Sequence, residues 1–202
     1  MTPSPVPREF FVQPTHMLAR NLLGKVLMLE SAGGRIVEVE AYQGPTDRGA
    51  HSFGGRRTAR TEVMFGEPGH AYIYRIYGRY DCVNVVSAAA GRPEAILVRA
   101  LEPLAASVDE FVRRRNCPPG THSARIPILT NGPGRLTQAL GIDRSWNGHP
   151  LWQEPFYIAD DGVVVPASDL RQGPRVGIAY AGMAAEFPWR YWIAGNPFVS
   201  RP

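Results

Sequence analysis

Hydrophobic and polar residues alternate along residues 35–42, Arg-Ile-Val-Glu-Val-Glu-Ala-Tyr, and a period of two is typical of a β-strand. One face of this strand carries Val37, Val39 and Ala41, and the other carries Glu38, Glu40 and Tyr42. The face opposite an aliphatic one usually shows neutral polar residues, whereas this face carries two carboxylates. The pattern therefore indicates either a solvated surface or a reaction site.

The residues after this strand favour a reaction site. Gly44-Pro45-Thr46-Asp47 is typical of a turn, and His51 follows a few residues later. One of the two carboxylates, the aromatic ring of Tyr42 and the imidazole of His51 are therefore expected together at one strand end.

The rest of the hydrophobic pattern predicts short elements separated by turns. Helices are expected at residues 15–23, with Thr15 as the N-cap, at 104–116, and at 136–140 after Gly132-Pro133-Gly134. Strands are expected at 25–30 and 35–42, joined by a Gly33-Gly34 turn, twice within 69–86, and at 95–101, 156–158, 163–165, 176–179 and 192–194.

Consecutive short strands with few helices predict an α+β fold. We expect a single mixed domain over residues 1–202, with an antiparallel β-sheet core and surrounding helices. Residues 1–9 are rich in proline and are expected to be a mobile lead-in.

The stretch 69–86 predicts a hairpin with a tight turn near Tyr77-Gly78. Tyrosines favour strands, so a structural role is the default for most of the tyrosines here. A tyrosine at the turn cannot be buried in the protein's own core, and Tyr77 is flanked by Arg75 and Arg79. We therefore expect a protruding, DNA-intercalating β-hairpin, with Tyr77 between stacked bases and the guanidinium groups on phosphates.

The net charge of +4 is carried by 21 arginines and one lysine, Lys25, against 18 acidic residues. Arginine suits phosphates, although a basic composition alone leaves nucleic-acid binding an open alternative. The run Arg56-Arg57-Thr58-Ala59-Arg60 is either a solvated loop or a contact with a phosphate backbone. Schiff-base chemistry on a sugar would need Lys25 or the terminal amine, and neither is near the carboxylate strand in the sequence.

Other features limit the class of protein. Apolar runs such as 95–98 are too short to cross a bilayer and no export signal is present, so a cytoplasmic protein is expected. Cys82 and Cys117 lie far apart and the five histidines form no paired motif, so we expect no disulfide framework, no metal and no cofactor. Arg99 lies in an otherwise apolar strand and must have an anionic partner.

Several motifs occur in one order along the chain: Val37-Glu38-Val39-Glu40-Ala41-Tyr42, Ala50-His51-Ser52, Tyr72-Ile73-Tyr74 with Ile76-Tyr77-Gly78, Arg99-Ala100-Leu101-Glu102-Pro103, Gly132-Pro133-Gly134 and Arg175-Val176-Gly177. Through them the chain resembles a bacterial member of the alkyladenine (3-methyladenine) DNA glycosylase family, from about residue 18 to residue 200. The resemblance implies a monofunctional glycosylase that flips alkylated or deaminated purines out of duplex DNA and hydrolyses the N-glycosidic bond. It implies a monomer that starts base excision repair without a metal.

The resemblance also implies roles for individual residues. Glu40 would deprotonate the attacking water, which Arg99 and the main-chain carbonyl of Val176 would help to hold. The base pocket would consist of Tyr42, His51, Tyr74, Leu97 and Asn84, with Asn84 placed where a guanine amino group would clash. Tyr77 would fill the gap in the duplex, and the DNA backbone would contact Arg56, Thr58, Met64, Arg75 and Arg79.

The chemistry of the residues fits this implication, because cleavage of an N-glycosidic bond passes through an oxocarbenium-like sugar that a carboxylate stabilises. Two other classes stay open. A module that binds damaged DNA or RNA would not need Glu40, and a nucleosidase would not need Tyr77 or Arg56. Base release from an alkylated duplex, compared with release from the free nucleoside, separates the three.

Overall fold

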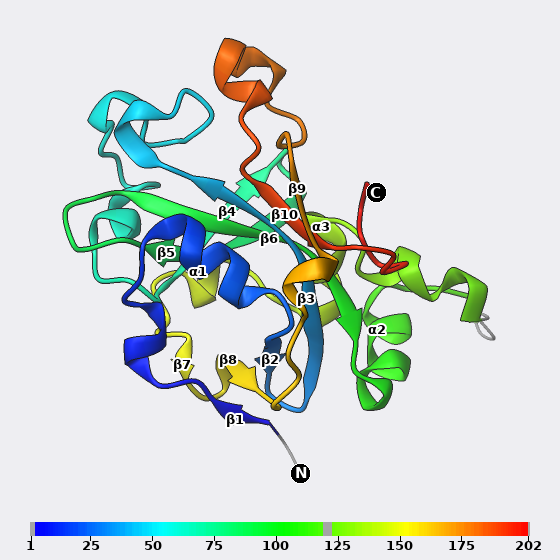
Figure 1. Ribbon diagram of the computed structural model, residues 1–202. Helices are drawn as coiled ribbons and strands as arrows, with labels where there is room; N and C mark the ends of the chain where they lie inside the picture. Colours follow the sequence, from blue (N-terminus) through cyan, green and yellow to red (C-terminus); the bar gives the residue numbers. More distant parts are fainter. Residues whose placement is uncertain (1–2, 119–122, 202) are drawn as a thin grey trace.

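The strands form one antiparallel sheet around a long central strand, β3 (Ala32–Tyr42) (Figure 1). The computed structural model describes residues 3–118 and 123–201. The sheet order is β1-β8-β2-β3-β6-β5-β4, with β10 beside β3 and β9, and β7 beside β8. The described residues thus form a single α+β domain with an antiparallel sheet core, as the sequence predicted.

The remaining strands are β1 (Ser4–Pro5), β2 (Val26–Leu29), β4 (Ala71–Ile76), β5 (Tyr80–Ser87), β6 (Glu94–Pro103), β7 (Trp152–Gln153), β8 (Phe156–Asp160), β9 (Leu170–Gly173) and β10 (Arg190–Ile193). The α-helices of the described part are α1 (Thr15–Leu22), α2 (Val108–Arg114) and α3 (Pro133–Leu140). The 3-10 helices are η1 (Arg8–Phe11), η2 (Gly44–Thr46), η3 (Phe53–Gly55), η4 (Glu62–Phe65), η5 (Ala105–Ser107), η6 (Ser123–Leu129), η7 (Arg144–Trp146), η8 (Ala167–Asp169) and η9 (Ala179–Glu186).

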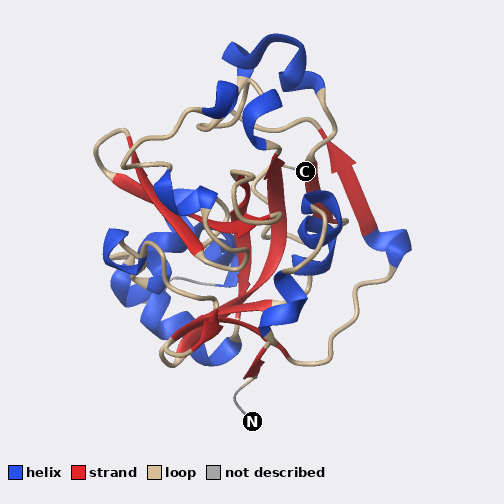
Figure 2. Cartoon of the chain, turned by 90° about the vertical axis from the view of Figure 1, so that its left-hand side faces the viewer, coloured by secondary structure: helices blue, strands red, loops and turns tan. Residues whose placement is uncertain are grey.

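The main apolar core lies between the sheet and the helices. Leu18 and Leu22 of α1 and Leu136 and Leu140 of α3 belong to this buried cluster. Figure 2 shows the strands in the middle of the molecule with helical segments around them. None of the described helices is both long and apolar enough to span a lipid bilayer.

β3 is buried on both faces, so its alternation does not separate a core face from a solvent face. Val39 and Ala41 join the main cluster, whereas Val37 belongs to a second cluster with Ala100. The register between β3 and β6 shifts at residues 36–39, and this β-bulge puts Val37 out of step with the later residues. The prediction that Val37 shares a face with Val39 and Ala41 is therefore wrong.

The β2–β3 hairpin turns at residues 30–31 and not at Gly33-Gly34. Glu30 has a φ of 56°, in the left-handed region that tight turns use. Gly33 pairs with Met28 inside the sheet, where a Cβ atom would lie 2.2 Å from the methionine sulfur. Glycine is needed here for close approach, and not for the turn.

Three further predictions need correction. Pro14, and not Thr15, is the N-cap of α1, because the Thr15 hydroxyl is bonded to the Glu94 carboxylate instead. Residues 163–165 and 176–179 are not strands, and neither segment pairs with a described strand.

The N-terminal lead-in contacts the sheet in the part that the structure describes. Ser4 pairs with Asp160, Pro5 pairs with Ala159, and Val6 is buried. Residues 1–2 lie outside the described residues, and the mobility of residues 1–9 stays a prediction.

Candidate active site

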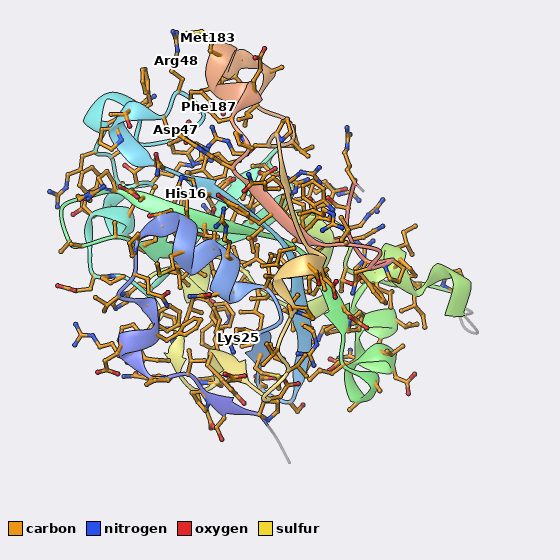
Figure 3. The ribbon with its side chains drawn as sticks, viewed as in Figure 1. His16, Lys25, Asp47, Arg48, Met183 and Phe187 are labelled. Atoms are coloured by element: carbon orange, nitrogen blue, oxygen red, sulfur yellow. The ribbon has the colours of Figure 1, made fainter. Side chains whose placement is uncertain are left out.

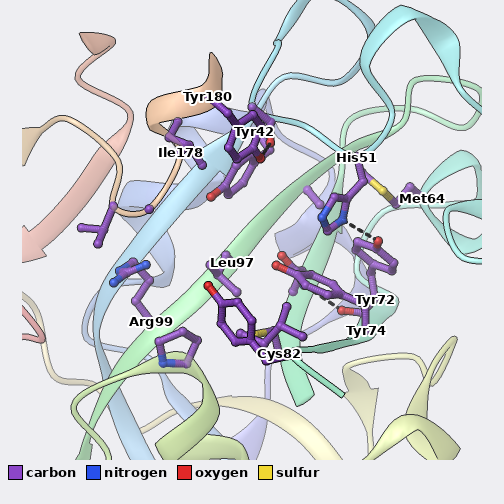
Figure 4. Close-up of a pocket in the computed structure, with 18 residues that line it drawn as sticks. Tyr42, His51, Met64, Tyr72, Tyr74, Cys82, Leu97, Arg99, Ile178 and Tyr180 are labelled. Carbon is purple, nitrogen blue, oxygen red and sulfur yellow. Dashed lines mark hydrogen bonds between the residues drawn. The ribbon is translucent and has the colours of Figure 1, made fainter. Parts of the chain in front are cut away.

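A cavity of about 270 Å³ collects side chains from distant parts of the chain (Figure 4). All five residues predicted for the base pocket line it: Tyr42, His51, Tyr74, Asn84 and Leu97. Arg99, Val176 and Tyr77 line it as well. The fold therefore brings Tyr42 and His51 together, as the strand and the turn after it predicted, and adds side chains that the sequence related only through the resemblance.

The Glu40 carboxylate is fully buried next to this cavity. Its Oε2 atom accepts a hydrogen bond of 2.9 Å from the Tyr42 hydroxyl, and its Oε1 atom accepts one of 2.6 Å from the Val176 N–H. Nη1 of Arg99 lies 3.3 Å from Oε1. These three partners line the cavity although Glu40 does not, so the carboxylate lies one contact away from it.

The second carboxylate, Glu38, accepts three hydrogen bonds from groups within the protein. It accepts hydrogen bonds from Arg99 Nε at 2.9 Å, Arg190 Nη1 at 3.2 Å and the Ser200 N–H at 2.6 Å. Arg99 therefore has two anionic partners, as its position in an apolar strand required. Glu38 holds Arg99 in place, and Glu40 is the carboxylate next to the cavity.

Burial raises the pKa of Glu40, although Arg99, the Val176 N–H and the Tyr42 hydroxyl act in the opposite direction. Burial also raises the pKa of Tyr42 well above its ordinary value, so this hydroxyl remains a donor. For Arg99, burial lowers the pKa, but Glu40 and Glu38 raise it more, so the guanidinium stays charged. The site therefore combines a carboxyl group of raised pKa, Glu40, with a guanidinium that stays charged, Arg99.

His51, Tyr72 and Tyr74 form an aromatic wall (Figure 4). Nδ1 of His51 lies 2.8 Å from the Tyr72 hydroxyl, and the His51 ring meets Tyr74 edge to face with 4.5 Å between centroids. Arg60 lies over the Tyr74 ring at 4.7 Å. Burial, and then the charge of Arg60, lower the pKa of His51 to about 4, so its imidazole is neutral at pH 7.

Asn84 is fixed by a bond across the hairpin. Its Nδ2 atom donates 2.9 Å to the main-chain carbonyl of Tyr72, its partner on β4, and Leu97 is its partner on β6. Both Asn84 and Leu97 are buried at the cavity wall. The clash of Asn84 with a guanine amino group stays a prediction.

A buried ion pair connects the two loops that carry the site. Arg175 donates to both Asp47 oxygens and to the main-chain carbonyl of Ala41, and both charged side chains are fully buried. The Arg175 guanidinium carbon also lies 4.6 Å from the centroid of the Tyr42 ring. The pair therefore fixes the loop of Val176 against the end of β3. Sequence reasoning missed this role, because Arg175 entered only as part of a motif.

The β4–β5 hairpin turns at Tyr77 and Gly78, as the sequence predicted. The Arg79 N–H donates to the Ile76 carbonyl at 3.1 Å, and Tyr77 and Gly78 have φ values of 51° and 64°. Positive φ at both central residues is what a type I′ turn requires. Tyr77 is 91% exposed, so its predicted place at an exposed tip is confirmed. Its insertion into DNA is a separate question.

A second depression, of about 340 Å³, shares His51 and Tyr180 with the cavity. We call it the basic depression; its lining includes Arg48, Arg56, Thr58 and Arg60. The arginine loop therefore lies beside the cavity, and its contact with a phosphate backbone stays a prediction.

Three other residues were expected to contact the DNA backbone. Met64 is buried at the cavity wall, with only 1% of the residue exposed, which does not favour a DNA contact. Arg75 donates two hydrogen bonds, of 3.0 and 2.8 Å, to Asp81 across the hairpin. Arg79 is exposed, 5.4 Å from the Tyr80 ring. All three DNA contacts stay predictions.

Sequence reasoning missed several residues that line the cavity, namely Tyr180, Ile178 and Cys82. Tyr180 lies just after the segment 176–179 that was expected to be a strand. The glycines on either side of it, Gly177 and Gly182, were the available signal, because they mark a loop.

Three features define the class of this site: an aromatic wall, a buried carboxylate beside the cavity and arginines next to it. Such a site suits a planar base next to phosphates. The comparisons agree with this class. The family described as Methylpurine-DNA glycosylase (MPG) matches residues 9–197.

Relatives named "Putative 3-methyladenine DNA glycosylase" are similar over nearly the whole chain. Those of Bacillus cereus strain AH820 and Bacillus anthracis strain A0248 are 44% identical over 202 residues, with 96% of this chain and 98% of the relative covered. That of Bacillus cereus strain B4264 is 45% identical over 206 residues, with the same coverage. The chain therefore belongs to the methylpurine-DNA glycosylase family and is a DNA glycosylase, which confirms the family expected from the motifs.

Proposed function

We propose that this chain releases alkylated and deaminated purines from double-stranded DNA by hydrolysing the N-glycosidic bond, with Glu40 as the general base. The observation that carries the proposal is the buried Glu40 carboxylate, whose three partners line an aromatic cavity. The name of the relatives supports 3-methyladenine as a substrate. Deaminated purines are proposed from the resemblance of the motifs.

In the proposed reaction the flipped purine stacks in the cavity among Tyr42, His51 and Tyr74. Each stacked base face contributes roughly 1–3 kcal/mol, which offsets the few kcal/mol that flipping costs. A water held by Arg99 and the Val176 carbonyl attacks C1′ of the sugar and gives its proton to Glu40. The C1′–N bond breaks, its electron pair leaves with the base, and an abasic site remains.

We further propose that the DNA strand stays intact. A lyase reaction needs an amine that attacks C1′. Lys25 is the sole lysine, and its Nζ atom lies 2.5 Å from Asp160, away from the loops that bear the cavity (Figure 3). Borohydride treatment during the reaction is therefore expected to trap no covalent complex. A trapped adduct would contradict the water mechanism.

The remaining parts of the proposal concern recognition. Tyr77 fills the gap left by the flipped nucleotide, and Asn84 disfavours normal guanine. Arg56, Thr58, Arg75 and Arg79 contact the DNA backbone, whereas Met64 is buried in the structure. We propose that residues 1–202 act as one glycosylase domain, as a monomer in the cytoplasm.

The decisive experiment measures single-turnover base release from an alkylated duplex by the wild type and by Glu40→Gln. The amide keeps the shape of the carboxylate but cannot take a proton, so release is expected to stop while affinity for the duplex is kept. Release by Glu40→Gln at the wild-type rate would assign the base elsewhere. Equal release from the free nucleoside would indicate a nucleosidase, and binding without release by the wild type would indicate a binding module.

A further inference from the structure

Large apolar side chains are exposed near the cavity, on the segment η9. Tyr180 is 69% exposed and Met183 is 82% exposed. Figure 3 shows Met183 and Arg48 at the same end of the molecule, with Lys25 far from both. Clustered apolar exposure of this kind marks an interaction site.

The small residues of η9 explain why its large ones face outward. Ala181 and Ala184 are buried in a cluster with Ile178, which attaches the segment to the body of the protein. The Tyr180 hydroxyl also donates a hydrogen bond of 3.3 Å to the Gly49 carbonyl. Tyr180 and Met183 are thus presented to solvent by an anchored segment.

Tyr180 separates two parts of the surface. Its side chain lines both the cavity and the basic depression, which also contains Arg48 and Arg56. Tyr77 lines the same cavity from the hairpin. Both loops therefore border the space that is proposed to receive the flipped base.

We propose that Tyr180 and Met183 form a second apolar contact with duplex DNA, against sugars and base edges of the strand that flanks the flipped nucleotide. The arginines of the adjoining basic depression bind the phosphates of the same strand. The occupant is DNA because Tyr180 lines both the cavity proposed to receive the base and the cationic depression beside it, and Met183 follows Tyr180 on the same segment. The inference rests on duplex DNA as the proposed substrate, and not on Glu40 as the base.

The test uses Glu40→Gln as the parent protein, so that the damaged base stays in the duplex, and adds Tyr180→Ser with Met183→Ser. The matched control adds Met17→Ser, because Met17 is also exposed (54%) but lies on α1, outside the cavity. Affinity for a lesion-containing duplex is measured over a salt series, beside thermal unfolding and sedimentation.

The double serine variant is expected to bind roughly five- to tenfold more weakly, as loss of stacking contacts does, with the salt slope and melting temperature of the parent. Binding equal to the Met17→Ser control would overturn the inference, with the proposed function intact. A change confined to self-association would also overturn it, by assigning the surface to a second copy of the chain. If the Glu40→Gln parent itself bound no DNA, the result would contradict duplex DNA as the substrate, and with it the proposed function.

Discussion

The Tyr42 hydroxyl donates a hydrogen bond of 2.9 Å to the Glu40 carboxylate, two residues earlier on the same strand. An ionised carboxylate offers about four acceptor positions. The Tyr42 hydroxyl and the Val176 N–H occupy two of them, and Nη1 of Arg99 lies 3.3 Å from Oε1, so acceptor capacity remains for the proposed water. Tyr42, which is proposed to stack on the flipped purine, therefore also orients Glu40, the proposed general base.

Base release is expected to fall as the pH drops through the pKa of Glu40, which burial raises above its ordinary value. Tyr42→Phe removes a hydrogen bond that lowers this pKa, so the acidic limb of the single-turnover pH profile should move to higher pH. A purely structural role for the hydroxyl would reduce the rate without moving the limb. A rate that is flat across the acidic range would contradict the assignment of Glu40.

Glu40→Gln is expected to unfold at a higher temperature than the wild type at neutral pH. The pKa of Glu40 is higher in the folded state than in the unfolded state. The contribution of Glu40 to folding stability is therefore complete at a pH below its unfolded-state pKa, and it is lost as the pH rises through its folded-state pKa. The difference in melting temperature should therefore shrink as the pH is lowered. A less stable variant at neutral pH would show that the contacts of Glu40 outweigh its burial.

The sequence predicted the central strand, the hairpin tip and the α+β class because each depends on local periodicity or turn chemistry. Apart from the resemblance, it could not separate the roles of Glu38 and Glu40, because only the fold shows that Arg190 and Ser200 bind Glu38 while the partners of Glu40 line the cavity. It also misplaced Gly33, whose constraint is a neighbouring methionine sulfur and not a turn. Contacts between distant segments decide such positions, and local patterns do not record them.

Tyr77→Ala is expected to change the free energy of unfolding by no more than about 0.5 kcal/mol, because Tyr77 is 91% exposed. Its effect should appear in flipping: release should slow most from well-paired lesions and least from mispaired ones. Thermal unfolding beside single-turnover release from both substrates checks this. A release defect indifferent to pairing would reject the intercalating role.

Arg56→Ala is expected to reduce the dependence of DNA affinity on salt by about 0.9 log units per tenfold salt, the value for one phosphate contact. Arg75→Ala should change the slope less, because Arg75 is already paired with Asp81. Arg113→Ala, on α2 and paired with Glu110, is the control and should leave the slope unchanged. A wild-type slope near zero would remove DNA phosphates from the interface.

Arg175→Met is expected to destabilise the fold by about 3–5 kcal/mol, because it leaves the Asp47 carboxylate buried without its cation. Adding Asp47→Asn should recover part of this loss in urea unfolding. The half-buried pair of Arg35 and Asp161 is the control, and Arg35→Met should cost only about 1 kcal/mol. Equal losses in the two pairs would contradict the connecting role of Arg175.

The position of β3 between β6 on one side and β2 and β10 on the other has a consequence for local unfolding. Amides of central strands exchange with solvent mainly when the whole domain opens, whereas loops open at much smaller free energies. Glu40 and Tyr42 are therefore expected in the part of the protein that opens last, while Tyr77 lies at an exposed hairpin tip. The tip can thus adapt to a bound partner while the buried carboxylate keeps its place.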